Sequence, residues 1–198
     1  MTKPSTKEKR IHKGELHKEV ASMLCFLSEP DSNDIVLDPF CGYGSIPIER
    51  ALTSPFRKIF AEDKNPKMIL ISTEKKSLIT GSRNKKVKVR HNDILDGGLK
   101  YPDHSIDKII TDPPWGFYEK HELTTDVFYK RMMEEFMRVI KPDGIVVVLT
   151  ANKNEFQACL ELIRHHLAQI RKFDILVSGK KAAVYKLKIK NGDRNRNF

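Results

Sequence analysis

Short apolar runs alternate along this chain with segments that have the periodicity of amphipathic helices. This alternation is typical of an α/β fold, in which helices cover both faces of a mostly parallel sheet. The apolar runs predict seven strands, over Ile35–Leu37, Lys58–Glu62, Lys86–His91, Ile106–Thr111, Ile145–Leu149, Ile170–Val177 and Ala182–Ile189. The helical patterns predict helices over Glu15–Ser28, Ser45–Leu52, Pro66–Thr80, Val127–Ile140 and Asn154–Leu167.

The length of 198 residues suits one well-buried domain. We expect a basic flexible arm over residues 1–13, the domain over 14–190 and a basic tail over 191–198. Hydrophobic residues make up 39% of the chain and charged residues 31%, as in soluble globular proteins. Without an apolar run of about 20 residues or a signal-peptide pattern, we expect a cytoplasmic protein with no membrane partner.

The formal net charge of +10 predicts attraction to polyanions such as RNA. Basic residues gather near the N-terminus, along Arg83–Arg90 and from Lys180 onward. In the middle cluster Val87 and Val89 alternate with charged residues, which predicts a strand with one buried face. Each cluster is either a solvated face or a track for RNA.

The three cysteines are widely separated, and none belongs to a Cys-x-x-Cys pair. Cys25, Cys41 and Cys159 therefore indicate neither a disulfide framework nor a zinc site. We expect reduced, mostly buried thiols and no bound metal.

Acids stand at the predicted carboxyl ends of four strands: Asp38, Asp63, Asp93 and Asp112. In an open parallel sheet, ligands bind outside these strand ends. A carboxylate at the second strand can accept both hydroxyls of a ribose, and one after the third suits the amine of an adenine.

A glycine turn follows the first of these acids. Gly42 and Gly44 allow close approach of a ligand to the backbone. A dinucleotide site needs a third glycine and avoids a carboxylate, whereas here that glycine is missing and Asp38 would face the phosphates. We therefore favour S-adenosylmethionine, which carries an ammonium and a sulfonium group, over NAD.

The tetrapeptide Asp112-Pro113-Pro114-Trp115 indicates the type of reaction. The lone pair of a base or amide amine is delocalised, and a carboxylate with a backbone carbonyl can localise it by accepting the amine hydrogens. The prolines fix the loop and remove competing N–H groups. Trp115 can stack on a base. The alternative is a Pro-Pro turn with a packed Trp.

These motifs resemble those of class I S-adenosylmethionine-dependent methyltransferases, and especially of the N2-guanine RNA methyltransferases related to THUMP-domain enzymes. The resemblance rests on Leu37-Asp38-Pro39-Phe40-Cys41-Gly42, Ile46-Pro47-Ile48-Glu49 and Thr111-Asp112-Pro113-Pro114-Trp115-Gly116. It implies a Rossmann-like fold and methylation of an exocyclic base amine, first of all guanine N2 in tRNA.

The resemblance also implies the roles of individual residues. The cofactor-binding residues are Asp38, Pro39, Cys41, Gly42, Gly44, Asp63, Asp93 and Ile94. The catalytic residues are Asp112, Pro113 and Trp115, and the substrate-binding residues are Pro114, Trp115, Phe117 and Tyr118.

Two features depart from the family pattern. Tyr43 stands where the family usually has a small residue. The roughly 15 residues before the first predicted helix cannot form a THUMP domain, so we expect RNA selection by the basic arms, by the loop Phe117–Asp126 or by a partner subunit.

Three other functions remain open from the sequence. N6-adenine methyltransferases also use an Asp-Pro-Pro-Trp loop, but there it normally precedes the cofactor motif, so the order here favours guanine. Protein glutamine-amide methyltransferases use a similar loop with Asn first. A silent methyltransferase-like RNA-binding subunit is the non-enzymatic alternative.

Overall fold

The computed structural model describes residues 12, 14–116 and 123–190. Its strands are β1 (Ile35–Asp38), β2 (Lys58–Asp63), β3 (Val87–His91), β4 (Ile106–Thr111), β5 (Ile140–Thr150), β6 (Leu167–Val177) and β7 (Lys180–Ile189). Its helices are α1 (Lys18–Leu27), α2 (Ser45–Thr53), α3 (Pro66–Lys75), the 3-10 turn η1 (Lys76–Leu78), α4 (Gly81–Lys86), α5 (Thr125–Val139) and α6 (Lys153–Leu162).

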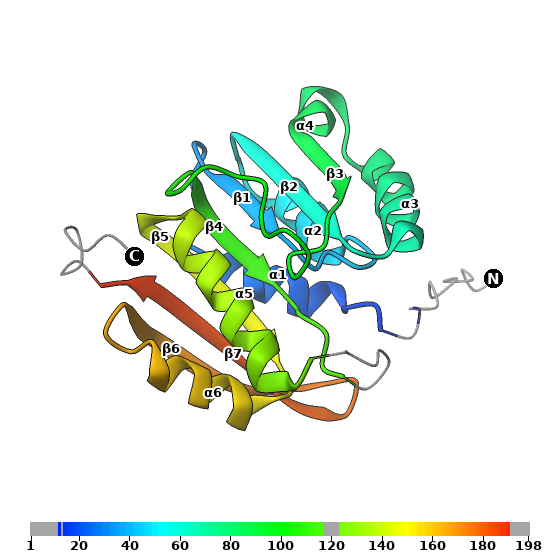
Figure 1. Ribbon diagram of the computed structural model, residues 1–198. Helices are drawn as coiled ribbons and strands as arrows, with labels where there is room; N and C mark the ends of the chain where they lie inside the picture. The colour runs from blue at the N-terminus through cyan, green and yellow to red at the C-terminus, as the bar shows by residue number, and fades with distance from the viewer. Residues whose placement is uncertain (1–11, 13, 117–122, 191–198) are drawn as a thin grey trace.

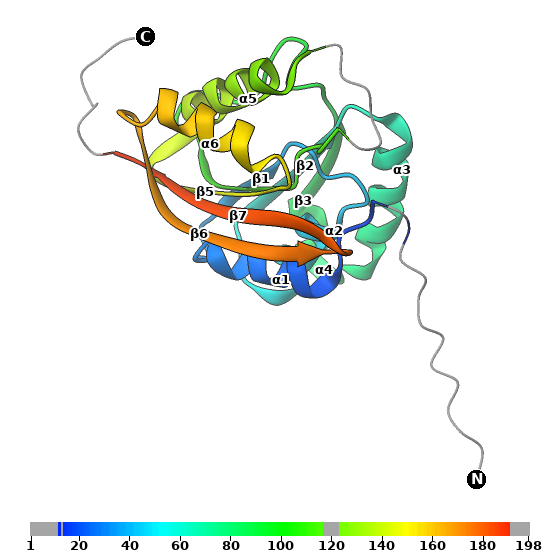
Figure 2. The ribbon, with the colours of Figure 1, turned by 90° about the horizontal axis from the view of Figure 1, so that it is seen from below.

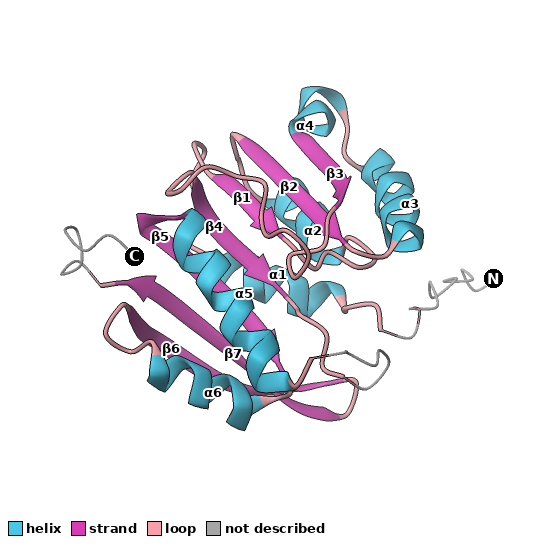
Figure 3. Ribbon diagram, in the orientation of Figure 1, coloured by secondary structure: helices cyan, strands magenta, loops and turns pink. Residues whose placement is uncertain are grey.

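All seven strands form one sheet in the order β3-β2-β1-β4-β5-β7-β6 (Figures 1 and 3). Strands β1 to β5 run parallel, and β7 pairs antiparallel with β5 and β6. The predicted seven-stranded, mostly parallel sheet is therefore confirmed. The strand order reverses between β1 and β4, and in such sheets the ligand crevice lies at this point, at the carboxyl ends of the strands.

Helices cover both faces of the sheet (Figure 2). The face under α5 and α6 buries Phe128, Met132, Phe136 and Phe156 in one core cluster. The opposite face, under α1 and α2, buries Leu24, Ile46 and Ile48 in a second. Successive strand residues supply the two cores in turn, because their side chains point to opposite faces: Val36 belongs to the second cluster and Leu37 to the first.

The helix predicted over Pro66–Thr80 is wrong in its last turn. It is interrupted after Lys75 by η1, and a separate helix, α4, follows. The side-chain amide of Asn84 donates to the carbonyl oxygens of Lys76 and Ile79, at 2.8 and 3.1 Å, and ties the turn together. The basic run Arg83–Arg90 is thus divided between α4 and β3.

Two other helix boundaries differ from the prediction by three residues or more. Helix α6 ends at Leu162 rather than Leu167, because Leu167 pairs with Ile189 as the first residue of β6. Helix α1 begins at Lys18 rather than Glu15. The residues just before α1 instead form part of the wall of a cavity described below.

Two features are absent from the described residues. No helix among them is long and apolar enough to cross a membrane. They contain no group of three or more His, Cys, Asp or Glu side chains placed to hold a metal ion. The three cysteines are free and buried, as predicted.

Candidate active site

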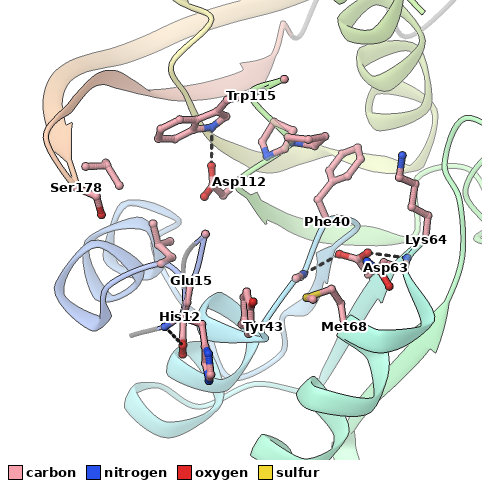
Figure 4. A pocket seen from close by; sticks show the side chains of 18 of the residues that line it. His12, Glu15, Phe40, Tyr43, Asp63, Lys64, Met68, Asp112, Trp115 and Ser178 are labelled. Atoms are coloured by element: carbon pink, nitrogen blue, oxygen red, sulfur yellow. Dashed lines mark hydrogen bonds between the residues drawn. The ribbon is translucent and has the colours of Figure 1, made fainter. Parts of the chain in front are cut away.

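A cavity of about 660 Å³ opens at the carboxyl ends of β1, β2 and β4 (Figure 4). Figure 4 shows Asp112 and Trp115 on one side of it and Asp63, Lys64 and Met68 on another. Its lining comes from the strand-end loops, the segment before α1 and the turn between β6 and β7. The lining residues used below are His12, Gly14, Glu15, Leu16, His17, Phe40, Gly42, Tyr43, Asp63, Lys64, Met68, Asp93, Leu95, Asp112, Pro113, Pro114, Trp115, Ser178 and Lys180.

The glycine turn after β1 is held in place by α3. Gly42 and Gly44 have φ values of +48° and +79°, which side-chain-bearing residues rarely adopt. The hydroxyl of Ser72, on α3, donates to the carbonyl oxygen of Gly42 at 2.7 Å. A Cβ at Gly44 would lie 3.0 Å from that same hydroxyl oxygen, so the close contact between turn and helix requires glycine there.

Asp38 is buried at the end of β1. Its Oδ1 accepts from the Thr111 hydroxyl at 2.8 Å and from the Phe40 N–H at 3.3 Å, while its Oδ2 is a buried acceptor with no hydrogen-bond partner among the described residues. Burial, together with the nearby acids Asp112 and Asp63, raises the pKa of Asp38 to about 8 despite these hydrogen bonds. Positive charge close to Asp38 would lower this pKa and stabilise the carboxylate.

Asp63 connects β2 to the glycine turn. Its Oδ2 accepts from the Gly42 N–H and its Oδ1 from the Asn65 N–H, both at 2.8 Å. A carboxylate has about four lone-pair sites, and this one lines the cavity. The side chain therefore shapes the turn and can also accept hydroxyl groups from a ligand.

Asp93 lines the same end of the cavity. Its Oδ1 accepts from the Leu95 N–H at 2.9 Å, which closes a short turn after β3. The side chain of Ile94 packs in the core, whereas that of Leu95 lines the cavity. Phe40 and Met68 line it as well and add apolar surface of the kind that an adenine ring contacts.

Asp112 lies at the end of β4 with its side chain at the cavity wall. Trp115 Nε1 donates to Asp112 Oδ1 at 2.9 Å, so the indole orients the carboxyl group. Burial raises the pKa of Asp112 to about 7, against the lowering effect of the bond from Trp115. A carboxyl group with this pKa can accept a proton near neutral pH.

The structure brings together most of the residues predicted from the sequence. Those that line the cavity are Gly42, Asp63, Asp93, Asp112, Pro113, Pro114 and Trp115. Those that lie behind its wall are Asp38, Pro39, Cys41, Gly44 and Ile94. Phe117 and Tyr118 fall outside the described residues.

Cys41 contacts the protein interior rather than the cavity. Its thiol lies 3.8 Å from the Ser72 hydroxyl oxygen, and burial raises its pKa well above the usual value. The thiol thus packs the glycine turn against α3.

No sequence signal marks Phe40, Met68 and Leu95 as part of the site, because they are apolar residues without a distinctive pattern. Before α1, His12 falls in the predicted arm, and Glu15, Leu16 and His17 fall in the predicted helix, so neither expectation places them at the cavity. Tyr43 departs from the family pattern, and a large ring beside a glycine turn is a sequence signal for its place at the cavity.

Comparison with known proteins agrees with this geometry. Residues 6–181 match the UPF0020 family model, described as an RMKL-like methyltransferase domain. The chain is 31% identical over 180 residues to the human tRNA (guanine(6)-N(2))-methyltransferase THUMP3, covering 87% of this chain and 36% of that protein. It is 30% identical over 134 residues to the Bos taurus U6 snRNA (guanine-N(2))-methyltransferase THUMPD2, covering 68% and 25%.

A solved structure has the same fold. The methyltransferase SMU.472, complexed with SAH, superposes with a TM-score of 0.73 at 15% identity, covering 93% of this chain and 56% of that one. This likeness concerns the fold alone, and the chain spans about a third or less of the two curated relatives described above. The family model covers most of the chain, and the chain therefore belongs to the RMKL-like methyltransferase domain family.

Proposed function

We propose that this chain transfers a methyl group from S-adenosylmethionine to the exocyclic N2 amine of guanine in RNA, with tRNA as the expected substrate. The observation that carries the proposal is the position of Asp112. Its carboxyl group, oriented by Trp115, faces the same cavity as Gly42 and Asp63. The carboxyl group that would accept the amine hydrogens and the residues expected to bind the methyl donor thus line one cavity.

The cavity fits a cationic nucleoside. Asp38 Oδ2 is a buried acceptor without a partner among the described residues, and positive charge would stabilise this carboxylate. There is open space beside the backbone of Gly42, since a Cβ added there would have no atom within 4 Å. In the proposal Gly42 holds the methionine end, Asp38 stabilises its positive charge from behind the cavity wall, Asp63 accepts the ribose hydroxyls, and Asp93 with Leu95 holds the adenine. When bound, S-adenosylmethionine supplies a methyl group made electrophilic by its sulfonium.

Asp112 prepares the acceptor. Trp115 occupies Oδ1, so Oδ2 is left to accept a hydrogen from the incoming amine. That bond shifts electron density onto the amine nitrogen, and the carboxylate can take the proton that the nitrogen loses. Pro113 and Pro114 have no N–H to compete for the same oxygen. Orientation of the two reactants in one cavity supplies much of the remaining rate enhancement.

Charge and relatives support RNA as the substrate. The net charge of +10 favours binding of a phosphate backbone. Lys64 lines the cavity just after β2 and Lys180 at the start of β7, where phosphates beside the target base can contact them. The described relatives act on tRNA and U6 snRNA, both at guanine N2, according to their names.

The test uses labelled methyl donor and unfractionated RNA, followed by digestion to nucleosides and mass identification of the methylated product. We expect N2-methylguanosine, absent with Asp112→Ala and retained with Asp143→Ala, an exposed acid at the other end of the sheet. Label in N6-methyladenosine or in protein glutamine would overturn the assignment of the acceptor. Donor binding without any labelled product in that assay would call for repetition with copurified partner proteins, and a second negative result would overturn the proposed activity.

A further inference from the structure

The wall of the cavity includes a segment that precedes the first helix. His12, Gly14, Glu15, Leu16 and His17 all line the cavity, and α1 begins only at Lys18. This segment is not one of the strand-end loops that usually build sites in such sheets. Something other than the sheet must therefore hold it in position.

Tyr43 makes the first contact with this segment. Its ring lies parallel to the imidazole of His12, with the ring centroids 5.4 Å apart and an interplanar angle of 2°. The ammonium group of Lys75, near the end of α3, lies 5.3 Å from the centroid of the Tyr43 ring. Figure 4 shows Tyr43 beside His12 on the same side of the cavity. A small residue at position 43 could make neither contact.

An ion pair makes the second contact. Lys75 also pairs with Glu15, and both side chains are mostly buried, with 23% and 17% of their surfaces exposed. Glu15 Oε2 accepts in addition from the His12 N–H at 3.2 Å. Although burial opposes it, these interactions lower the pKa of Glu15. Lys75 thus joins α3, the glycine turn and the segment before α1.

We propose that Tyr43, Lys75 and Glu15 form a clasp that positions His12 and residues 14–17 as a wall of the methyl-donor pocket. The inference rests on the proposed function, since the donor is the ligand that the wall would contact. Tyr43 and Lys75 are positioning residues in this arrangement. Tyr43, the large residue in the glycine turn, thereby holds the segment before α1 that closes the pocket.

The expected size of the effect follows from the kinds of contact. Cation–π contacts and partly exposed ion pairs each shift an equilibrium by a factor of roughly 2 to 5. The clasp therefore keeps the wall closed most of the time without locking it. Because apparent affinity scales with the closed fraction, loss of the clasp should weaken donor binding about threefold to tenfold.

Lys75 offers the cleanest test, because it is absent from the lining of the cavity. We expect Lys75→Met to raise the Kd for S-adenosylhomocysteine about threefold to tenfold by calorimetry, without RNA or turnover. Lys75→Arg keeps the charge and should restore most of the affinity. Lys67→Met removes an exposed lysine from the same helix and should match the wild type. Tyr43→Ala should weaken binding at least as much as Lys75→Met, whereas Tyr43→Phe keeps the ring and should bind normally.

A second measurement follows the segment itself. Hydrogen exchange of the backbone amides of residues 14–17, in protein without ligand, should be faster in Lys75→Met and Tyr43→Ala than in Lys67→Met and the wild type. Unchanged exchange would overturn the clasp, as would unchanged Kd values in both variants. If the wild type does not bind S-adenosylhomocysteine at all, the proposed function fails, and the exchange data still decide whether the clasp exists.

Discussion

The acids at one end of the sheet have basic partners, whereas two acids at the other end do not. At the end where the strands begin, Asp34 pairs with the buried guanidinium of Arg50 at 2.9 Å, and Asp107 pairs with Lys141 at 2.7 Å. At the end where the strands finish, Asp38 and Asp112 have no ion pair within the described part of the chain, and burial raises both pKa values.

We infer that this difference separates structural acids from those proposed to act on a ligand. A buried acid with a basic partner is already neutralised and holds elements together, whereas buried acids without one destabilise the fold until a ligand supplies charge or hydrogens. The 660 Å³ cavity lies at the end of the sheet where the acids have no basic partner, and Asp112 lines it. Each prediction below tests whether the two ends respond differently to the same kind of substitution.

The largest effect is expected at Asp112. Asp112→Ala removes the acceptor for the amine, and we expect turnover to fall roughly 10²- to 10⁴-fold. The donor Kd should stay within about threefold, because the group acts on the acceptor rather than on the donor. Single-turnover methylation and calorimetry measure the two quantities. A parallel loss of donor affinity would mean that Asp112 belongs to the donor site.

Asp34→Ala should give the largest loss of stability. It leaves Arg50 buried without its carboxylate partner, which costs about 3–5 kcal/mol of unfolding free energy. Denaturant unfolding measures this loss. Asp107→Ala is the matched control, since it removes a partly exposed pair with Lys141 and one acceptor of the Ile35 N–H and should cost only about 1–2 kcal/mol. Equal losses in the two variants would contradict the assigned roles.

In contrast to Asp34→Ala, Asp38→Asn should stabilise the protein at alkaline pH. The folded pKa of Asp38, about 8, lies above its ordinary value, so folding favours the protonated acid. This stabilisation is present at low pH and is lost as the pH rises toward 8. Relative to the wild type, the Asn variant should therefore gain stability between pH 5 and pH 9, by about 4 kcal/mol. Thermal unfolding across that pH range measures the trend, and a pH-independent difference would contradict it.

The smallest effect concerns the pH dependence of turnover. Asp112 must be a carboxylate to accept amine hydrogens, and its pKa is about 7 before any ligand binds. Below that value kcat/KM should fall about tenfold per pH unit. Bound donor should shift the midpoint of kcat lower, because a nearby cation favours the carboxylate. Identical midpoints for kcat and kcat/KM would show that the donor charge does not reach Asp112.

Most elements of the fold could be predicted from local sequence patterns. The alternation of Val87 with Lys88 and the apolar runs at Ile35 and Ile106 depend on neighbouring residues, so the sequence predicted these strands correctly. The helix ends were less predictable. Leu167 satisfies a helical period, but its pairing with Ile189 in the sheet decides its conformation.

The chemistry of the site could likewise be predicted from the sequence, but its arrangement could not. Acids at strand ends and the Asp112–Trp115 loop follow from local signals, because a parallel sheet brings its strand ends to one edge. That Asp38 lies behind the wall and that Trp115 donates to Asp112 depends on how the loops pack.

The sequence by itself determined an α/β sheet, a glycine turn and an Asp-Pro-Pro-Trp loop, since each depends on residues close together in the chain. Only the tertiary structure decided what closes the cavity. Glu15 and Lys75 lie 60 residues apart, and their contact requires α1, α3 and the glycine turn to pack as they do. Contacts between residues so far apart produce no periodic pattern in a sequence. Only the folded chain therefore places Tyr43 against the segment before α1 that forms a wall of the cavity.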